Sequence, residues 1–392
     1  MTKAVLSNSS HPEYGVVSIP LPIPKEQYDG CTELLEALEM GNTTRHDCRV
    51  EELHTPWPVL NRLEGAQVNL EELDYLAKRL DSFDDGEVAQ FQAMAEKLGL
   101  TSLKDLINLS FCCQQATVIT DFSDLEAIGR NHYLNTHGGC ASTEELGNLD
   151  GEETAILLME STPATVTRYG VVYDNGMQLK QIYDGKHLPC YIYDDAVLSL
   201  GLTSRGNPKD TTWLYLPATK KQLERGMLRS GIQDPEDMRL QVGNSEFPME
   251  VDVALDFKQE SIFDLNDLAW AVARLDRDDL QKLGAVVAMA RPENAIQIRH
   301  LAENLELFQF APGTHTPAKY GMFMIQQSGH FEYDPNLDEF YDYEKYGLQH
   351  MNQETGTFTD RGYVAYHGTI SLEVLMMGET HQEEQTFQMG GM

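Results

Sequence analysis

The residues whose types could support covalent chemistry lie at positions 137–140, which read His-Gly-Gly-Cys. A His-Gly-Gly turn can form an oxyanion hole, and Cys140 could act as a nucleophile beside a histidine. A glycine-rich turn that leads into a helix capped by Ser142 is the simpler interpretation, because the match is short and brings no placed base. The chain has no H-E-x-x-H, G-x-S-x-G, Walker or G-x-G-x-x-G motif. We therefore predict that the protein is not an enzyme, with a cysteine hydrolase centred on Cys140 as the enzymatic alternative.

The other cysteines and the histidines predict neither a metal site nor a cofactor. The six cysteines form no C-x-x-C pair, which argues against a zinc ribbon or thioredoxin-type chemistry. Cys112 and Cys113 could form a redox pair, but next to an apolar helix we interpret them as small buried residues. The twelve histidines include no two at ligand spacing beside a third ligand.

Net charge is the strongest global signal in the sequence. The chain has 392 residues, with 62 Asp and Glu against 29 Lys and Arg, which gives a formal net charge of −33. Such a chain repels nucleic acid and anionic membranes and is attracted to basic surfaces. We expect no direct nucleic acid binding and no membrane association, since no apolar stretch approaches the roughly 18 residues of a membrane span. Sparse cysteines and an N-terminus without a signal-peptide pattern predict a cytoplasmic protein.

Two groups of carboxylates are the candidate binding residues. The first lies on or just after a helix predicted at 69–81: Glu71, Glu72, Asp74, Asp81, Asp84 and Asp85. The second lies in an aromatic-rich segment near the C-terminus: Asp334, Asp338, Glu339, Asp342 and Glu344. A charge run is usually a solvated face. However, B-form DNA presents one phosphate charge about every 1.7 Å of its axis. An elongated protein with excess carboxylates could present a similar field to a DNA-binding groove.

The helix at 69–81 is the element that organises the predicted fold, because its pattern recurs at 264–276, 195 residues later. Leu70, Leu73, Ala77 and Leu80 form one helical stripe, and the second copy repeats it. Asn69 and Asp264 can each cap their helix, with an acid three residues later in both copies. Leu-Pro at 21–22 and at 216–217 share the same offset. We therefore predict an internal duplication and an α+β fold: an elongated chain of two related modules, each combining a small antiparallel sheet with a bundle of short helices.

The remaining pattern divides these modules into segments. Further helices are predicted at 33–39, 87–98, 101–109, 125–134 and 142–150, a strand at 14–19, and a hairpin with strands at 166–173 and 177–183. A polar stretch at 201–212 is the best candidate for a linker. The predicted segments are an N-terminal α/β part (1–65), a helical part (66–135), a divergent strand-rich part with linker (136–210), the second N-terminal part (211–262), the second helical part (263–326), an acidic aromatic segment (327–378) and a disordered tail (379–392).

Several strings in the sequence resemble the ArdA antirestriction family. Residues 340–347, Phe-Tyr-Asp-Tyr-Glu-Lys-Tyr-Gly, followed by Gly-Thr-Phe-Thr-Asp-Arg-Gly-Tyr at 356–363, look like that family's C-terminal signature. Residues 103–109 and 122–129 resemble its middle helical segment. The likeness covers most of both modules and is weakest around 136–212, and the first module lacks the Tyr-Gly and Gly-Thr-Phe ending. The chain is about twice the family's basic length and so resembles a tandem version.

The resemblance implies a non-enzymatic DNA mimic encoded with mobile DNA. ArdA proteins are elongated, acidic and usually dimeric, and they occupy the DNA-binding groove of type I restriction-modification enzymes. The implied partner is the methyltransferase core of such an enzyme, and the tandem chain could act alone or as a homodimer. The alternative that the residues leave open is an acidic adaptor or inhibitor of another basic DNA-binding protein or nuclease.

Overall fold

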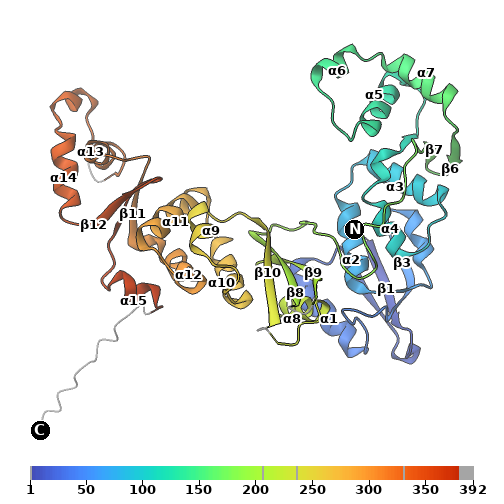
Figure 1. Ribbon diagram of the computed structural model, residues 1–392, viewed down its shortest axis with the longest axis horizontal. Helices are drawn as coiled ribbons and strands as arrows, with labels where there is room; N and C mark the ends of the chain where they lie inside the picture. The colour runs from blue at the N-terminus through green and yellow to red at the C-terminus, as the bar shows by residue number, and fades with distance from the viewer. Residues whose placement is uncertain (1, 205–206, 235–236, 330–331, 379–392) are drawn as a thin grey trace, which may run out of the picture. The chain divides into compact units, whose positions relative to one another are not determined.

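The computed structural model describes residues 2–204, 207–234, 237–329 and 332–378. Helices alternate with small antiparallel sheets, so the predicted α+β class is confirmed (Figure 1). The chain divides into two compact units: the first is Met1–Tyr193, Ser204–Trp213 and Thr219–Asp237, and the second is Asp194–Thr203, Leu214–Ala218 and Met238–Met392. The predicted disordered tail at 379–392 lies outside the described residues.

The first unit begins with a four-stranded sheet of order β2-β1-β3-β4, packed against helices. Its elements are β1 (Thr2–Asn8), β2 (Val16–Leu21), α1 (Tyr28–Ala37), β3 (Cys48–His54), β4 (Gln67–Val68), α2 (Leu70–Asp81), α3 (Asp85–Lys97) and α4 (Leu103–Leu109). Leu70, Leu73, Ala77 and Leu80 of α2 are all buried, as the stripe predicts. The Asn69 side chain accepts a hydrogen bond from the Glu72 backbone N–H at 3.3 Å and caps α2.

The rest of the first unit is a second sheet and a group of helices. Its elements are β5 (Thr117–Ile119), α5 (Leu125–Thr136), α6 (Thr143–Asn148), α7 (Gly151–Ser161), β6 (Thr165–Thr167) and β7 (Gly170–Tyr173), with α8 (Lys220–Arg229) also in this unit, and the sheet has the order β5-β7-β6. The predicted hairpin at 166–183 is wrong in both halves. The single strand predicted at 166–173 is divided into β6 and β7, which pair with each other. Asn175 and Gly176 turn the chain, but residues 177–183 form no strand. Instead, the Asn108 side chain bonds both backbone groups of Tyr183, at 2.7 Å and 2.9 Å, and so replaces a partner strand.

The second unit also combines helices with small antiparallel sheets. Its elements are α9 (Met249–Ala254), α10 (Ile262–Val272), α11 (Arg277–Ala290), α12 (Ala295–Glu303), β11 (Phe308–Pro312), α13 (Pro317–Gln326), α14 (Tyr343–Met351), β12 (Thr355–Thr359), β13 (Gly362–Tyr366) and α15 (Leu372–Met376), with a sheet of order β11-β13-β12. A further sheet has the order β10-β8-β9, with β8 at Leu198–Ser204, β9 at Asn207–Leu216 and β10 at Met238–Ser245. The predicted linker at 201–212 is therefore wrong, because Leu198, Leu200 and Leu202 are fully buried in β8.

The repeat runs at two offsets rather than one. The peptide bonds Leu21-Pro22 and Leu216-Pro217 are both cis and 195 residues apart. From α2 onward the helix caps are 192 residues apart: Asn69 and Ser261, Asp84 and Asp276, Ser102 and Asn294, Asp124 and Thr316, Ser142 and Asp334, Asp150 and Asp342. Consequently Asp264 lies in the first turn of α10, and Ser261 caps that helix instead. The common origin of the two modules remains a prediction. Helix caps that recur at a constant spacing are what a duplication would produce.

One part of the segment at 136–210, residues 165–170, matches the second module. At the 192 offset, Thr-Val-Thr-Arg-Tyr-Gly at 165–170 matches Thr-Phe-Thr-Asp-Arg-Gly at 357–362. In both places a Thr hydroxyl donates to a glycine carbonyl at 2.8 Å, from Thr167 to Gly170 and from Thr359 to Gly362. The first module therefore has the strand ending that the sequence comparison missed.

Close backbone packing joins α5 to α7, and it gives a test of this arrangement. A Cβ atom placed on Gly129 of α5 would lie 1.9 Å from the Gly151 carbonyl oxygen of α7. We expect Gly129→Ala to force the two helices apart at a cost of about 1–3 kcal/mol. Hydrogen exchange followed by mass spectrometry should then show reduced protection of the amides in α5 and α7. Gly147→Ala in α6 is the control, since its Cβ would meet nothing within 4 Å. Equal protection in both variants would contradict the packing.

Candidate partner-binding surfaces

The first predicted carboxylate group is split by the fold. Glu72 and Asp74 of α2 are 4% and 7% exposed, and the Glu71 side chain is 18% exposed. Asp81, Asp84 and Asp85 are exposed at the end of α2 and the start of α3. Burial removes Glu71, Glu72 and Asp74 from any surface that a partner could reach, so their prediction as surface residues is corrected.

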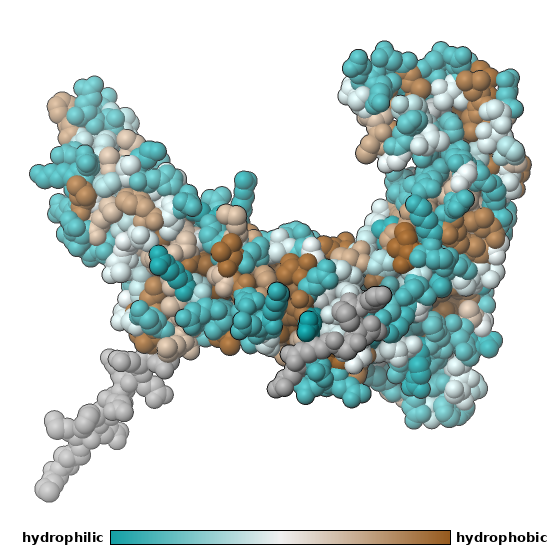
Figure 2. All heavy atoms as spheres, viewed as in Figure 1, coloured by the Kyte–Doolittle hydropathy of each residue, from teal (hydrophilic) through white to brown (hydrophobic). Residues whose placement is uncertain are grey.

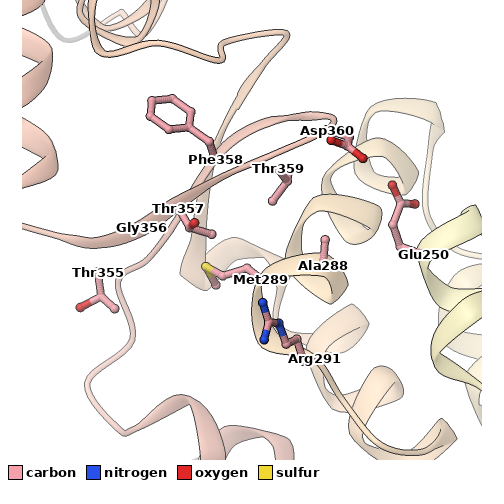
Figure 3. Close-up of a pocket in the computed structure, with 10 residues that line it drawn as sticks. All are labelled: Glu250, Ala288, Met289, Arg291, Thr355, Gly356, Thr357, Phe358, Thr359 and Asp360. Carbon is pink, nitrogen blue, oxygen red and sulfur yellow. The ribbon is translucent and has the colours of Figure 1, made fainter.

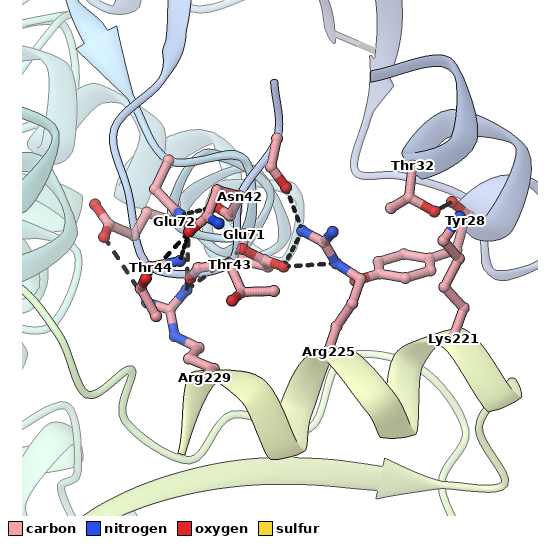
Figure 4. Close-up of polar contacts among 12 residues, drawn as sticks. Tyr28, Thr32, Asn42, Thr43, Thr44, Glu71, Glu72, Lys221, Arg225 and Arg229 are labelled. Atoms are coloured by element: carbon pink, nitrogen blue, oxygen red, sulfur yellow. Dashed lines mark hydrogen bonds and ion pairs between the residues drawn. The ribbon is translucent and has the colours of Figure 1, made fainter. Parts of the chain in front are cut away.

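Glu71 and Glu72 are buried because α8 covers them with two arginines (Figure 4). The Arg225 Nε donates to Glu71 Oε1 at 2.9 Å, and its Nη2 donates to the Gly41 carbonyl at 2.8 Å. Arg229 Nη1 donates to the Thr43 carbonyl at 3.0 Å and lies 3.5 Å from Glu71 Oε2. Burial alone would lower the pKa of the Arg225 guanidinium. The nearby Glu71 carboxylate more than offsets this effect, so the pKa of Arg225 is raised. The cluster is therefore an internal ionic contact that fixes α8 to α2.

Asp74 has a different structural role. Its Oδ1 accepts a hydrogen bond from the Ile23 backbone N–H at 2.6 Å, and Lys78 lies 3.2 Å from its Oδ2. Asn266 occupies the equivalent place in the second module and accepts from the Ala218 N–H at 2.7 Å. Each side chain fixes the backbone just after the Leu-Pro peptide bond of its own module.

The second predicted carboxylate group is exposed throughout: Asp334, Asp338, Glu339, Asp342 and Glu344. Asp342 caps α14 by accepting from the Lys345 N–H at 3.0 Å. Asp338 Oδ1 accepts from the hydroxyls of Tyr343 and Tyr333 and from Gln326 Nε2, the last at 3.1 Å. The hydrogen bonds from Tyr343 and Tyr333 hold the pKa of Asp338 below its ordinary value. This carboxylate therefore stays charged near neutral pH and orders the tyrosines around it.

A third set of exposed carboxylates was missed by the sequence reasoning. It lies on residues 121–161, which we call the first acidic hairpin, formed by α5, α6 and α7. The carboxylates are Asp121, Asp124, Glu126, Glu144, Glu145, Asp150, Glu152, Glu153 and Glu160. Arg130 is the single Lys or Arg in this range, and its Nε lies 2.9 Å from Glu126 Oε1. In Figure 2 the surface over α6 is mostly hydrophilic, while the surface over α7 also shows hydrophobic patches, and Ile156 and Leu157 of α7 are exposed.

Its counterpart is residues 316–351 with α13 and α14, which we call the second acidic hairpin. Two of its acids match acids of the first hairpin at the 192 offset: Asp150 with Asp342, and Glu152 with Glu344. A search at 192 rather than 195 would have found this match from the sequence. The chain thus carries two equivalent helical hairpins with exposed carboxylates.

The candidate nucleophile has no catalytic surroundings in the described structure. Cys140 is exposed, and the His137 Nδ1 lies 2.7 Å from the Tyr133 carbonyl oxygen, with its ring stacked on Tyr133. Cys112 and Cys113 are buried, and burial raises the pKa of each thiol. Among the described residues no group of three or more His, Cys, Asp or Glu could hold a metal ion. The same residues contain no helix with the length and apolarity that crossing a membrane requires.

A groove of about 430 Å³ lies beside β12 in the second unit (Figure 3). It is lined by Glu250, Ala288, Met289, Arg291 and residues 355–360. Glu250 is not available as a catalytic acid, because Arg361 donates to both of its oxygens at 2.7 Å and 2.8 Å. The equivalents of Ala288 and Asp360 in the first module are Glu96 and Arg168, whose side chains bond at 3.3 Å. The groove is lined by acidic, basic and hydroxyl side chains, and its Glu250 carboxylate is already bound by Arg361.

Comparison of the chain with protein-family models and with curated proteins finds no match.

The ionic contact under α8 predicts a large effect of one substitution. Arg225→Met leaves Glu71 buried without its main partner, so we expect a loss of about 3–5 kcal/mol in unfolding free energy, measured by urea denaturation. Lys220→Met is the control on the same helix, because the Lys220 side chain is 83% exposed. It should change stability by less than about 0.5 kcal/mol. Equal stability of both variants would show that α8 does not depend on this contact.

The pair of Glu250 and Arg361 predicts a pH dependence of stability. The hydrogen bonds from Arg361 lower the pKa of Glu250 from its ordinary 4.5. The stabilisation is therefore present above pH 4.5 and is lost as the pH falls through the lowered pKa. We expect Glu250→Gln to cost about 1–2 kcal/mol at neutral pH and much less in strong acid, by urea denaturation at each pH. Glu293→Gln, at an exposed site, should show no such dependence.

Proposed function

We propose that this protein is an antirestriction protein of the ArdA type. It acts as an acidic DNA mimic that occupies the DNA-binding groove of a type I restriction-modification enzyme, at the methyltransferase core. It acts by binding rather than by catalysis, in the cytoplasm, and does not itself bind nucleic acid.

The observation that carries this proposal is the pair of acidic hairpins. Each presents exposed carboxylates on a helix pair, and the first has one Lys or Arg across residues 121–161. The net charge of −33 and the resemblance of residues 340–347 and 356–363 to the ArdA signature support the same function. Carboxylates that replace phosphates would meet the Lys and Arg residues that normally contact the DNA backbone.

The tandem arrangement affects how many copies of this chain one partner enzyme would bind. Two modules in one chain can supply two acidic hairpins where a single-module relative would need two chains. Whether this chain also forms a homodimer is decided by light scattering on the purified protein.

Competition with DNA tests the proposed function directly. The protein should displace a target duplex from a type I methyltransferase core, and its affinity should fall as salt rises, because charged contacts dominate the binding. A triple variant with Glu332→Gln, Glu339→Gln and Glu344→Gln should bind several-fold more weakly and with a shallower salt dependence. The matched control removes equal charge elsewhere, with Glu224→Gln, Glu293→Gln and Glu373→Gln, all at exposed positions.

Two results would count against the proposal. No displacement of DNA at low salt would exclude it. Displacement from an unrelated basic nuclease, tested in parallel, with none from the methyltransferase core, would favour a different basic partner.

A further inference from the structure

Phe340 is the most exposed aromatic side chain in the part of the chain that the structure describes, at 81%. It ends a short 3-10 helix, Pro335–Phe340, within the second acidic hairpin. Leu337, three residues earlier, is 47% exposed. Single exposed apolar side chains are common, but leaving a large aromatic ring in water forgoes the free energy that its burial would provide. Phe340 and Leu337 are two exposed apolar side chains on one short helix, which a partner could cover.

The neighbours of Phe340 hold the segment in place while leaving this ring outside. Tyr341 packs between Tyr333 and Tyr343, with ring centroids 6.0 Å and 5.7 Å away. Asp338 accepts hydrogen bonds from the Tyr333 and Tyr343 hydroxyls. Binding would therefore lose little conformational freedom in this segment, which favours affinity.

The charges around Phe340 identify the kind of partner. Glu332, Asp334, Asp338, Glu339, Asp342 and Glu344 surround it in sequence, and residues 332–344 contain no Lys or Arg. A ring flanked by carboxylates matches a groove whose walls are Lys and Arg and whose floor accepts an aromatic group. DNA methyltransferases have such a groove, because they stack the base that they extrude from the duplex between apolar or aromatic side chains.

We propose that Phe340 is the apolar anchor of the second acidic hairpin and that its ring enters the base-binding pocket of the partner's DNA groove. This inference rests on the proposed function and adds to it a specific contact that charge alone does not supply. The first acidic hairpin lacks the anchor, since the position 192 residues earlier is Asn148, which is also exposed. The two hairpins are therefore not interchangeable in the complex.

The test measures affinity for the methyltransferase core across a salt series. Phe340→Ala and Phe340→Asn, the second of which installs the residue of the first hairpin, should each weaken binding by about tenfold to a hundredfold. Their salt dependence should match the wild type, because no charge is removed. Phe340→Trp keeps a stacking ring and should bind within a few-fold of wild type. Val253→Ala, at an apolar residue that is 80% exposed on α9, is the control and should leave binding unchanged.

The results of this experiment distinguish a failure of the Phe340 anchor from a failure of the proposed DNA mimicry. If the wild type binds and Phe340→Ala binds equally well, the anchor is excluded while the mimicry stands. Asp342→Asn removes one charge and should flatten the salt dependence. If Phe340→Ala weakens binding and flattens the salt dependence in the same way, Phe340 only positions the carboxylates, and the anchor is again excluded. Asparagine can still cap α14, so Asp342→Asn removes charge without removing the cap. Failure of the wild type to bind rejects the proposed function itself.

Discussion

The burial of Glu71 against Arg225 and Arg229 takes carboxylates of α2 out of the reach of a partner and joins α8 to α2. A charge taken out of water is tolerated only with close compensation. Burial raises the pKa of Glu71, and Arg225 and Arg229 oppose this effect by pairing with its carboxylate. Each such pair removes one acid and one base from the surface together. The excess of acids over bases is unaffected by this cancellation. The two acidic hairpins hold 15 acids against three bases, which is −12 of the net −33.

The hairpins can carry this excess because backbone contact holds their helices together. A Cβ on Gly129 would lie 1.9 Å from the Gly151 carbonyl, and a Cβ on Gly321 would lie 2.0 Å from the Tyr343 carbonyl. The apolar clusters beneath them are correspondingly small: Ile119, Ile128, Ala155, Leu158 and Tyr173 in the first, and Ala311, Tyr320, Met324, Tyr363 and Ala365 in the second. Helices that meet through glycine need few large apolar residues at their contact, which leaves most other positions for solvated side chains.

Sequence reasoning found the parts of this structure that depend on local patterns. The α2 stripe, the Asn69 cap and the capping box of Ser142 with Glu145 all have local causes, and all are present. It failed where a distant segment decides the outcome. A helical stripe shows which face is apolar, but it cannot show that α8, some 150 residues later, covers Glu71 on the polar side. Likewise, Asn108 satisfies the Tyr183 backbone across 75 positions of sequence, so a strong turn signal at Asn175 and Gly176 produced no hairpin.

The acids of the hairpins fall into two groups. Some stabilise helices, and others make no structural contact through their carboxylates within the described part of the chain and are therefore the better candidates for binding a partner. Asp150 and Asp342 cap helices, and Glu152 and Glu344 lie in the first turns, where the helix dipole favours negative charge. These four residues are explained by folding. The carboxylates of other exposed acids of the hairpins, such as Glu160 and Glu339, make no hydrogen bond or ion pair with any residue that the structure describes. Mutual repulsion among such charges costs stability. Folding alone therefore gives no account of them, whereas the proposed partner, with a groove lined by Lys and Arg, would account for them.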